Sequence, residues 1–280
     1  LGWVLAAVFL LMAWQTSALG SQPKVRVLLK SGVRELKVRG LGLEVDGLFQ
    51  TSLLQKRRLK VAIVKNSQKK KRLWKLQEAS GTTHWLPISK DGLRLRGESL
   101  RWSSVLQGRS LVLVPETGQT TFQIITQVDL KSYLKGVLPS EMPLSWPLEA
   151  LKAQAVASRT YVLFQMQKRR SKSFDVEATV QDQVFDKSKY LSLKPKWQRK
   201  LHAALNQTSQ KVLTTASGQV LAAYFHADCG GKTESPKNVW AHVSSKGAGT
   251  VEDPHCPQSP AGHWSFHISR EDFQRRVFPS

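Results

Sequence analysis

The spacing of apolar and polar positions changes near Asp129, and this change divides the chain into two regions. From Val25 to Val128, short apolar or alternating runs recur between Gly and Ser clusters, which is typical of β-strands joined by turns. The runs read VRVLL, ELKVRG, LKVAIVK, TTHWLPI, SLVLVPE and TFQIITQV. We therefore predict a β-rich region over residues 25–128.

After Asp129 the apolar positions follow a helical period. Between Leu130 and Val137 they fall at i, i+3, i+4 and i+7, and Asp129 is placed to cap the helix at its N-terminus. We expect this helix to end before Pro139, because a proline restricts the residue that precedes it to extended conformations.

A second, longer helix is predicted over Glu149–Lys168, which contains neither Gly nor Pro. Ser145 and Pro147 mark its start. Its polar stripe is narrow, so the helix should be buried on nearly all sides. Since buried arginines are rarely unpaired, Arg159 should either pair with an acidic residue or line a polar site.

The rest of the chain mixes both kinds of element. We predict a short strand within residues 171–186, a helix within residues 194–208, a hairpin that turns at Ser217–Gly218, and a helix from Arg270. The expected fold class is α+β, with a β-rich N-terminal part followed by a mixed helix and strand core. We assign residues 129–280 to that core, which looks interrupted or truncated at its C-terminal end.

The first residues have a composition of their own. Leu1–Trp14 has no polar side chain, and small residues follow at Thr16, Ala18 and Gly20. A membrane-spanning helix needs about 20 apolar residues, so this shorter run favours a signal peptide over residues 1–20, with an uncleaved anchor as the alternative. We expect a protein that is exported, either periplasmic or associated with the cell wall, or anchored by its N-terminus.

The net charge of the chain indicates which class of partner it binds. Lys and Arg number 42 against 20 Asp and Glu, for a net charge of +22. Such a surface attracts nucleic acid, anionic lipid or acidic wall polymers. Export disfavours nucleic acid and leaves an anionic wall polymer or a membrane surface. The basic clusters Gln55–Arg58, Lys69–Arg72 and Lys168–Arg170 are either solvated loop tips or part of that contact.

The chain has two cysteines, Cys229 and Cys256, and no C-x-x-C pair. In an oxidising compartment they are predicted to form one disulfide. A zinc set with His226 and His255 is the weaker alternative, and we expect no metal or other cofactor.

Glu141 stands in the stretch VLPSEMPLSWP, between prolines and apolar side chains. Apolar surroundings raise the pKa of a carboxyl group, and a carboxylic acid that stays protonated near neutral pH can act as a general acid. The alternative is an exposed glutamate in a proline-rich turn.

Four stretches carry a resemblance to a known family: YLKGVLPSEMPLSWPLEALKAQAVASRTY, DQVF, FHADCGGKTES and VEDPHCPQSP. In this order they resemble the stage II sporulation protein D or amidase enhancer family (SpoIID/LytB). The first stretch is specific and the others are individually weak. The resemblance covers about residues 129–264, whereas residues 25–128 match only as a generic β-rich lead-in.

The resemblance implies a peptidoglycan lytic transglycosylase. Such enzymes cut the bond between N-acetylmuramic acid and N-acetylglucosamine, prefer strands stripped of stem peptides, and leave a 1,6-anhydro end. It implies that Glu141 is the catalytic acid and base. Ordinary glycosidases need two carboxyl groups, but here the sugar's own C6 hydroxyl attacks C1, so one carboxylate suffices.

The resemblance also implies supporting residues. Arg159 is expected to hold the sugar or to orient Glu141, and four further residues are expected to bind substrate or support the site: Gln183, Gly230, Gly231 and Lys232. The two glycines are equally consistent with a tight turn. Some members of the family bind zinc just before the DQVF block, but the corresponding segment DVEATVQDQVF has neither His nor Cys, so zinc is not expected there.

A second function remains open. The enhancer members of the family are credited with stimulating a wall amidase, so the chain is either a glycan-cutting enzyme or a non-catalytic module that binds the wall. The expected partners are accordingly peptidoglycan glycan strands and a cell-wall amidase.

Overall fold

The structure is a computed structural model, and the residues that it describes are 23–46, 58–65, 71–102, 105–239, 249–256, 265 and 267–277. The expected signal peptide, residues 1–20, lies outside them, as do residues 55–57 and 69–70 of two basic clusters. Among the described helices, none has the length and apolar character needed to cross a membrane. The chain forms two compact units, Leu1–Gln210 and Lys211–Ser280, which are treated separately below.

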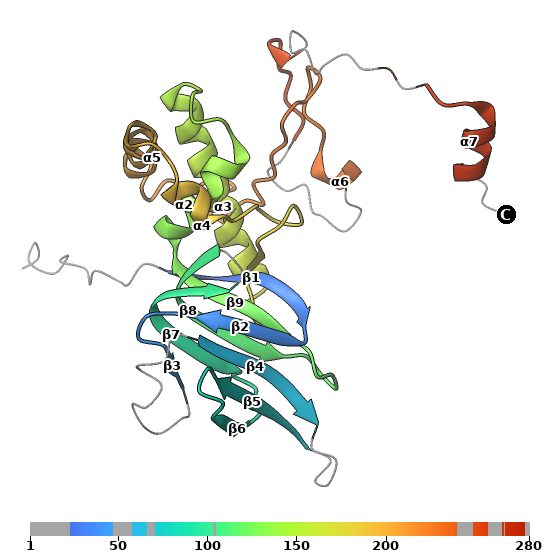
Figure 1. The fold of residues 1–280 in the computed structure, drawn as a ribbon. Helices are drawn as coiled ribbons and strands as arrows, with labels where there is room; N and C mark the ends of the chain where they lie inside the picture. Colours follow the sequence, from blue (N-terminus) through green and yellow to red (C-terminus); the bar gives the residue numbers. More distant parts are fainter. Residues whose placement is uncertain are drawn as a thin grey trace, which may run out of the picture. The chain divides into compact units, whose positions relative to one another are not determined.

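One mixed sheet dominates the first unit (Figure 1). Its strands lie in the order β10-β1-β9-β8-β7-β2-β4-β5-β6, and β3 pairs with β7. Neighbours are antiparallel except β1 and β10, which are parallel. In chain order the strands are β1 (Lys24–Val33), β2 (Glu35–Arg39), β3 (Glu44–Val45), β4 (Arg58–Lys65), β5 (Arg72–Glu78), β6 (Thr83–Pro87), β7 (Leu93–Trp102), β8 (Val105–Pro115), β9 (Phe122–Asp129) and β10 (Val176–Glu177).

The sheet curves so that strands far apart in its order share one core. Trp74 of β5 meets Phe122 of β9 edge to face, with ring centroids 5.3 Å apart. Both rings are buried, in a cluster that also takes Val33, Leu95 and Leu113 from three other strands. Alternation of side chains along each strand places these residues on the inner face. The β-rich region therefore has a hydrophobic core of its own.

The six apolar runs of the sequence correspond to β1, β2, β4, β6, β8 and β9, whereas β3, β5, β7 and β10 were not among them, β10 being the short strand expected separately. In β7, Leu93 and Leu95 point into the core while Arg94 and Arg96 lie on the other face.

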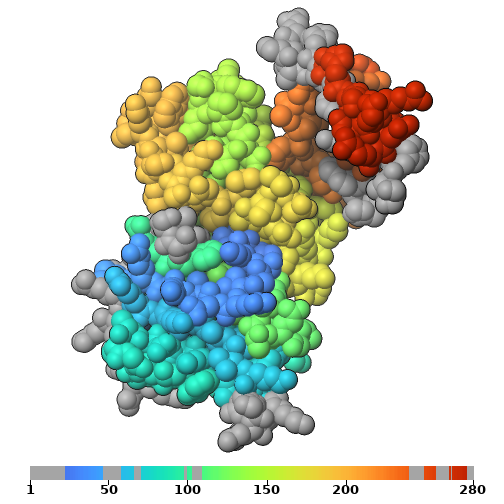
Figure 2. All heavy atoms as spheres, turned by 45° about the vertical axis from the view of Figure 1, so that its right-hand side comes forward, coloured from blue at the N-terminus to red at the C-terminus, as the bar shows by residue number. Residues whose placement is uncertain are grey.

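The described helices are divided between the two units. The helices are α2 (Leu130–Glu141), α3 (Leu148–Lys168), α4 (Lys187–Leu191), α5 (Pro195–Gln207), α6 (Pro236–Val239) and α7 (Arg270–Val277). Helices α2 to α5 belong to the first unit, and α6 and α7 belong to the second. The predicted fold class, α+β with a strand-rich N-terminal part, is confirmed. In the space-filling view the cyan to teal strands β4, β5 and β6 lie at one end of the first unit and α3 and α5 at the other, with the blue atoms of β1 between them (Figure 2).

A second core joins the helices to the sheet through β1. Val25 and Val27, which are fully buried, pack with Leu134 and Val137 of α2 and with Leu151 of α3. The two regions expected from the change of period thus share one compact unit, and the boundary between compact units lies at Gln210.

The expected end of the first helix was wrong. Pro139 lies inside α2, which continues to Glu141. A proline removes one helical hydrogen bond, but Leu138 and Pro139 are buried in the helical core, and the Met142 N–H still bonds to the Leu138 carbonyl at 3.2 Å. Glu141 is therefore the last residue of a helix and not part of a free loop.

The second unit has little regular structure among its described residues. The predicted turn is present, because Gly218 has a φ of 80° and the Thr215 N–H bonds to the Gln219 carbonyl at 2.8 Å. Further along, Lys232 forms a β-bridge with Glu252. The helix expected from Arg270 is α7.

Candidate active site

Glu141 is a half-buried carboxyl group at the C-terminal end of α2. Burial raises its pKa above the ordinary value, while a hydrogen bond from Val184 and the charge of Lys189 act in the opposite direction. The Val184 N–H donates to Oε1 at 3.2 Å. The negative end of the helix dipole also disfavours a carboxylate at this position. The pKa of Glu141 is thus raised, which is the direction that the sequence predicted.

The DQVF segment is held against α2 beside this carboxyl group. The Tyr133 ring stacks on Phe185 with centroids 5.5 Å apart and 11° between the planes. The Asp186 N–H donates to the Gly136 carbonyl at 3.0 Å. A Cβ at Gly136 would lie 2.5 Å from the Phe185 ring, so glycine permits this close approach. These contacts fix the backbone that presents the Val184 N–H to Glu141.

Gln183 lies inside the protein, with 1% of its surface exposed. Its Oε1 accepts a hydrogen bond from the Tyr133 hydroxyl at 3.0 Å, whereas its Nε2 has no partner among the described residues. Burial raises the pKa of Tyr133 well above its usual range, with Asp182 and Glu141 adding to the effect. Gln183 thus links α2, through Tyr133, to the backbone next to Val184.

Asp182 anchors the same segment to α3, and sequence reasoning missed it. Its side chain is 1% exposed and pairs with Arg169. It also accepts hydrogen bonds from the Tyr161 hydroxyl at 2.7 Å and from the Glu177 N–H at 2.8 Å. Burial, with the bond to Asp182 next, raises the pKa of Tyr161 above its usual range. A lone acidic residue between two glutamines gives no sequence signal of such a cluster.

Arg159 lies on α3 with 6% of its surface exposed, so the buried face expected for this helix is present. Burial lowers the pKa of its guanidinium. The electrostatic neighbour that acts on Glu141 is Lys189 of α4, which the sequence had not suggested.

Gly230, Gly231 and Lys232 belong to the second unit, whereas Glu141 belongs to the first. Both glycines have positive φ, 63° and 105°, as the tight-turn alternative requires. The Lys232 ammonium lies 2.8 Å from a Glu252 carboxylate oxygen, with both side chains largely exposed.

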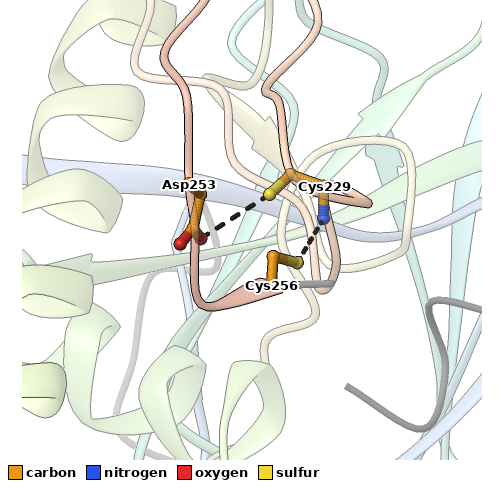
Figure 3. A group of neighbouring side chains, drawn as sticks. All are labelled: Cys229, Asp253 and Cys256. Carbon is orange, nitrogen blue, oxygen red and sulfur yellow. Dashed lines mark hydrogen bonds between the residues drawn. The ribbon is translucent and has the colours of Figure 1, made fainter. Parts of the chain in front are cut away.

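The two cysteines lie side by side in the second unit (Figure 3). Both are free thiols, and their sulfur atoms and an Asp253 oxygen lie within 4.8 Å of one another. The Cys229 thiol faces Asp253 at 3.6 Å, and the Cys256 thiol faces Asp228 at 3.0 Å. A hydrogen bond with Cys256 raises the pKa of the Cys229 thiol.

These side chains could hold a soft divalent metal, but not through the histidines considered above. Among the described residues, the group of potential ligands consists of Cys229, Asp253 and Cys256, and neither His226 nor His255 belongs to it. Two thiols and a carboxylate are a donor set that zinc accepts. The same closeness of the two sulfur atoms also suits the disulfide that we predict.

We expect Cys229 and Cys256 to be joined in the protein purified without reductant. The segments that carry them are already paired, since the Thr233 N–H bonds to the Val251 carbonyl at 2.9 Å and the Asp253 N–H to the Gly231 carbonyl at 2.8 Å. The cysteines are 27 positions apart, so the bond should stabilise the second unit by about 3–4 kcal/mol on the chain-entropy model. Thiol titration and melting with and without reductant measure both effects. Two reactive thiols with one equivalent of bound zinc would contradict the prediction.

The comparisons bear on residues 118–215, which match the model of the SpoIID family, described as stage II sporulation protein. Over this region the chain is similar to the SpoIID family. Glu141, Arg159 and Gln183 lie within the match, and the cysteines and the Gly-Gly turn lie outside it. The family supports a function related to the cell wall and an extracytoplasmic location.

Three relatives illustrate the likeness. An uncharacterized protein of Brachyspira hyodysenteriae is 39% identical over 132 residues, which are 47% of this chain and 33% of that protein. The amidase enhancer of Bacillus subtilis is 39% identical over 108 residues, 39% of this chain and 13% of that protein. Stage II sporulation protein D of Bacillus subtilis is 30% identical over 170 residues, 57% of this chain and 48% of that protein. The chain thus spans less than half the length of each.

Proposed function

We propose that the protein is a peptidoglycan lytic transglycosylase in which Glu141 is the general acid and then the general base. The observation that carries the proposal is the state of this carboxyl group, which is half-buried at a helix end with a raised pKa and with one oxygen held by the Val184 N–H. The substrate class is the glycan strand of the cell wall, cut between N-acetylmuramic acid and N-acetylglucosamine, with strands lacking stem peptides preferred.

The reaction needs one proton carrier. Glu141 donates its proton to the glycosidic oxygen as the bond from that oxygen to C1 breaks. The C6 hydroxyl oxygen of the same sugar then bonds to C1, and its proton passes to Glu141, which returns to the protonated state. The product ends in a 1,6-anhydro ring, and no water is consumed.

The hydrogen bond from Val184 gives the two carboxyl oxygens different roles. Oε1 is occupied by the backbone N–H at 3.2 Å, which leaves Oε2 to carry the transferable proton. The nearby Asp182 does not offer a second carboxylate for a two-carboxylate mechanism, because Arg169, Tyr161 and the Glu177 N–H already occupy its oxygens.

The direct test is digestion of purified glycan strands stripped of stem peptides, followed by mass analysis of the ends. Anhydro ends support the proposal, and they are about 18 mass units lighter than hydrolysed ends because they lack one water. Reducing ends would indicate hydrolysis and overturn it. We also propose that the protein acts outside the cytoplasm, bound to the wall or held by its N-terminus.

A second candidate function is stimulation of a cell-wall amidase without glycan cleavage. It is favoured by the likeness to the Bacillus subtilis amidase enhancer, which is 39% identical over 108 residues. Under this alternative the basic surface binds anionic polymers of the wall, and the protein partner is a cell-wall amidase. Intact strands after prolonged digestion, together with faster release of stem peptides by an added amidase, would select it.

The pH profile gives a further prediction. A general acid works in its protonated form, so the cleavage rate should fall as pH rises through the raised pKa of Glu141. Lys189 lowers that pKa, and the change Lys189→Gln should therefore move the alkaline limb of the profile to higher pH. Rates measured across pH for this variant and for Lys90→Gln, an exposed lysine elsewhere, check the effect. A limb that moves equally in both variants, or in neither, would count against Glu141 as the acid.

A further inference from the structure

Five cations lie on one face of the sheet in an arrangement that depends on strand register. Arg39 of β2 stands opposite Arg58 of β4 on one side and opposite Arg101 of β7 on the other. Lys37, on the same face of β2 two residues away, stands opposite Lys60 of β4. We call these five residues the basic ladder.

The basic ladder breaks a rule of sheet stability. Like charges directly opposite one another on neighbouring strands are destabilising. Among the described residues, Lys60 is the member with an ion-pair partner, Glu35 at 2.8 Å, and that pair is largely exposed. Within the described part of the chain, the other four form no ion pair with an acidic residue. A local rule that is broken without compensation is typical of a functional site.

The basic ladder borders a cavity of about 440 Å³. Val38 and Leu59 also contribute to its lining, and both residues are 2% exposed because their side chains belong to the core of the sheet. The acidic residue in the lining, Glu78, is 4% exposed and bonds to His84, so it faces the interior. The described lining contains no aromatic side chain. The cavity is therefore bordered by the positive charges of the basic ladder.

We infer that the basic ladder binds a linear polymer of sugar or polyol units joined through phosphodiesters. Neighbouring strands are about 4.8 Å apart, so three arginines in register form a straight row of positive charge. Each guanidinium can bind a phosphate through two parallel hydrogen bonds. A straight row suits a chain with repeating phosphates better than a single small anion.

The surroundings distinguish this polymer from other phosphate carriers. Proteins that bind single-stranded nucleic acid stack its bases on aromatic side chains, and the cavity offers none in its described lining. A membrane surface would favour apolar side chains that protrude beside the charges. In the lining of the cavity Val38 and Leu59 are recessed, and the exposed Trp85 of β6 lies outside that lining. The basic ladder also lies outside residues 118–215, so this binding is a function separate from glycan cleavage.

The test is titration of the full chain with a synthetic oligo(glycerol phosphate) at fixed salt. Arg39→Gln should weaken binding at least about tenfold, since a charged hydrogen-bonding partner is lost at the centre of the row. The same change should raise Tm without ligand, by up to about 4 °C, because it relieves the repulsion with Arg58 and Arg101. The control Arg170→Gln removes the same charge from an exposed position elsewhere and should change binding less than about twofold by screened charge alone.

Other outcomes would overturn the inference. Equal losses in Arg39→Gln and Arg170→Gln would mean that diffuse charge does the binding. A lower Tm for Arg39→Gln would make that residue a structural one. Binding to oligothymidylate as tight as to the glycerol phosphate polymer would indicate a nucleic-acid site, and binding to phosphatidylglycerol vesicles in place of the soluble polymer would indicate a membrane site. Glu141→Gln should leave all of this binding unchanged.

Discussion

Glu141→Gln is expected to lower the rate of glycan cleavage by about 10²–10⁴-fold while the protein stays folded. Glutamine keeps an oxygen that can accept the Val184 N–H, but it cannot release a proton. The readout is the yield of anhydro ends from strands stripped of stem peptides, with melting curves recorded for the same samples.

The matched control is Glu149→Gln. This side chain is 78% exposed and pairs with Lys152 at 2.7 Å on the first turns of α3. An exposed pair contributes about 0.3–0.5 kcal/mol, so neither activity nor stability should change appreciably. Cleavage by Glu141→Gln at the rate of the wild type would remove Glu141 from the mechanism.

The stability of Glu141→Gln relative to the wild type should depend on pH, and the direction follows from the raised pKa of Glu141. Because burial favours the protonated form of Glu141, its contribution to stability is fully present below the ordinary value of 4.5 and is lost as pH rises through the raised value. Glutamine has no such loss. Glu141→Gln should therefore gain in relative stability at neutral pH, and the gain should shrink in acid.

The largest loss of stability is expected from Asp182→Ala. Alanine would leave the Arg169 guanidinium, the Tyr161 hydroxyl and the Glu177 N–H without their common acceptor. Removing one partner of a buried ion pair destabilises by about 3–5 kcal/mol, and the value here should be near 3 because Arg169 is a quarter exposed. Urea denaturation monitored by fluorescence gives the free energy of unfolding.

Asp46→Ala serves as the comparison. Asp46 pairs with Arg96 at 3.1 Å, but its side chain is 45% exposed, so about 1 kcal/mol or less should be lost. Similar losses in the two variants would mean that the Asp182 cluster does not hold the DQVF segment. Cleavage should also fall in Asp182→Ala at temperatures where it remains folded, because the Val184 N–H would no longer be fixed.

Sequence reasoning found six of the strands, including β2, whose outward positions are charged. It missed β7, although Leu93 and Leu95 alternate there with Arg94 and Arg96. The end of α2 was placed too early because a proline rule that holds for isolated chains was overridden by burial of Pro139. Local signals thus located most elements, and tertiary packing decided their ends.

Part of the candidate site could also be predicted from local sequence signals. Glu141 could be singled out because prolines and apolar residues surround it in the sequence. Asp182 could not, since its partner Arg169 comes from a helix 13 positions earlier and the pairing depends on the fold. The basic ladder could not be predicted from the sequence, because Arg39 and Arg101 become neighbours only through the register of β2 with β7.

The position of β1 limits how this protein can be divided. Residues 118–215 carry the family match, yet the helices within that range bury Val25 and Val27 of β1 in their own core. The Arg26 guanidinium also reaches back to Asp175 at 2.6 Å. A fragment excised at the limits of the match would expose this apolar surface and leave Asp175 without its counter-ion. The family segment should consequently not fold autonomously, and any minimal soluble version must begin upstream of Lys24.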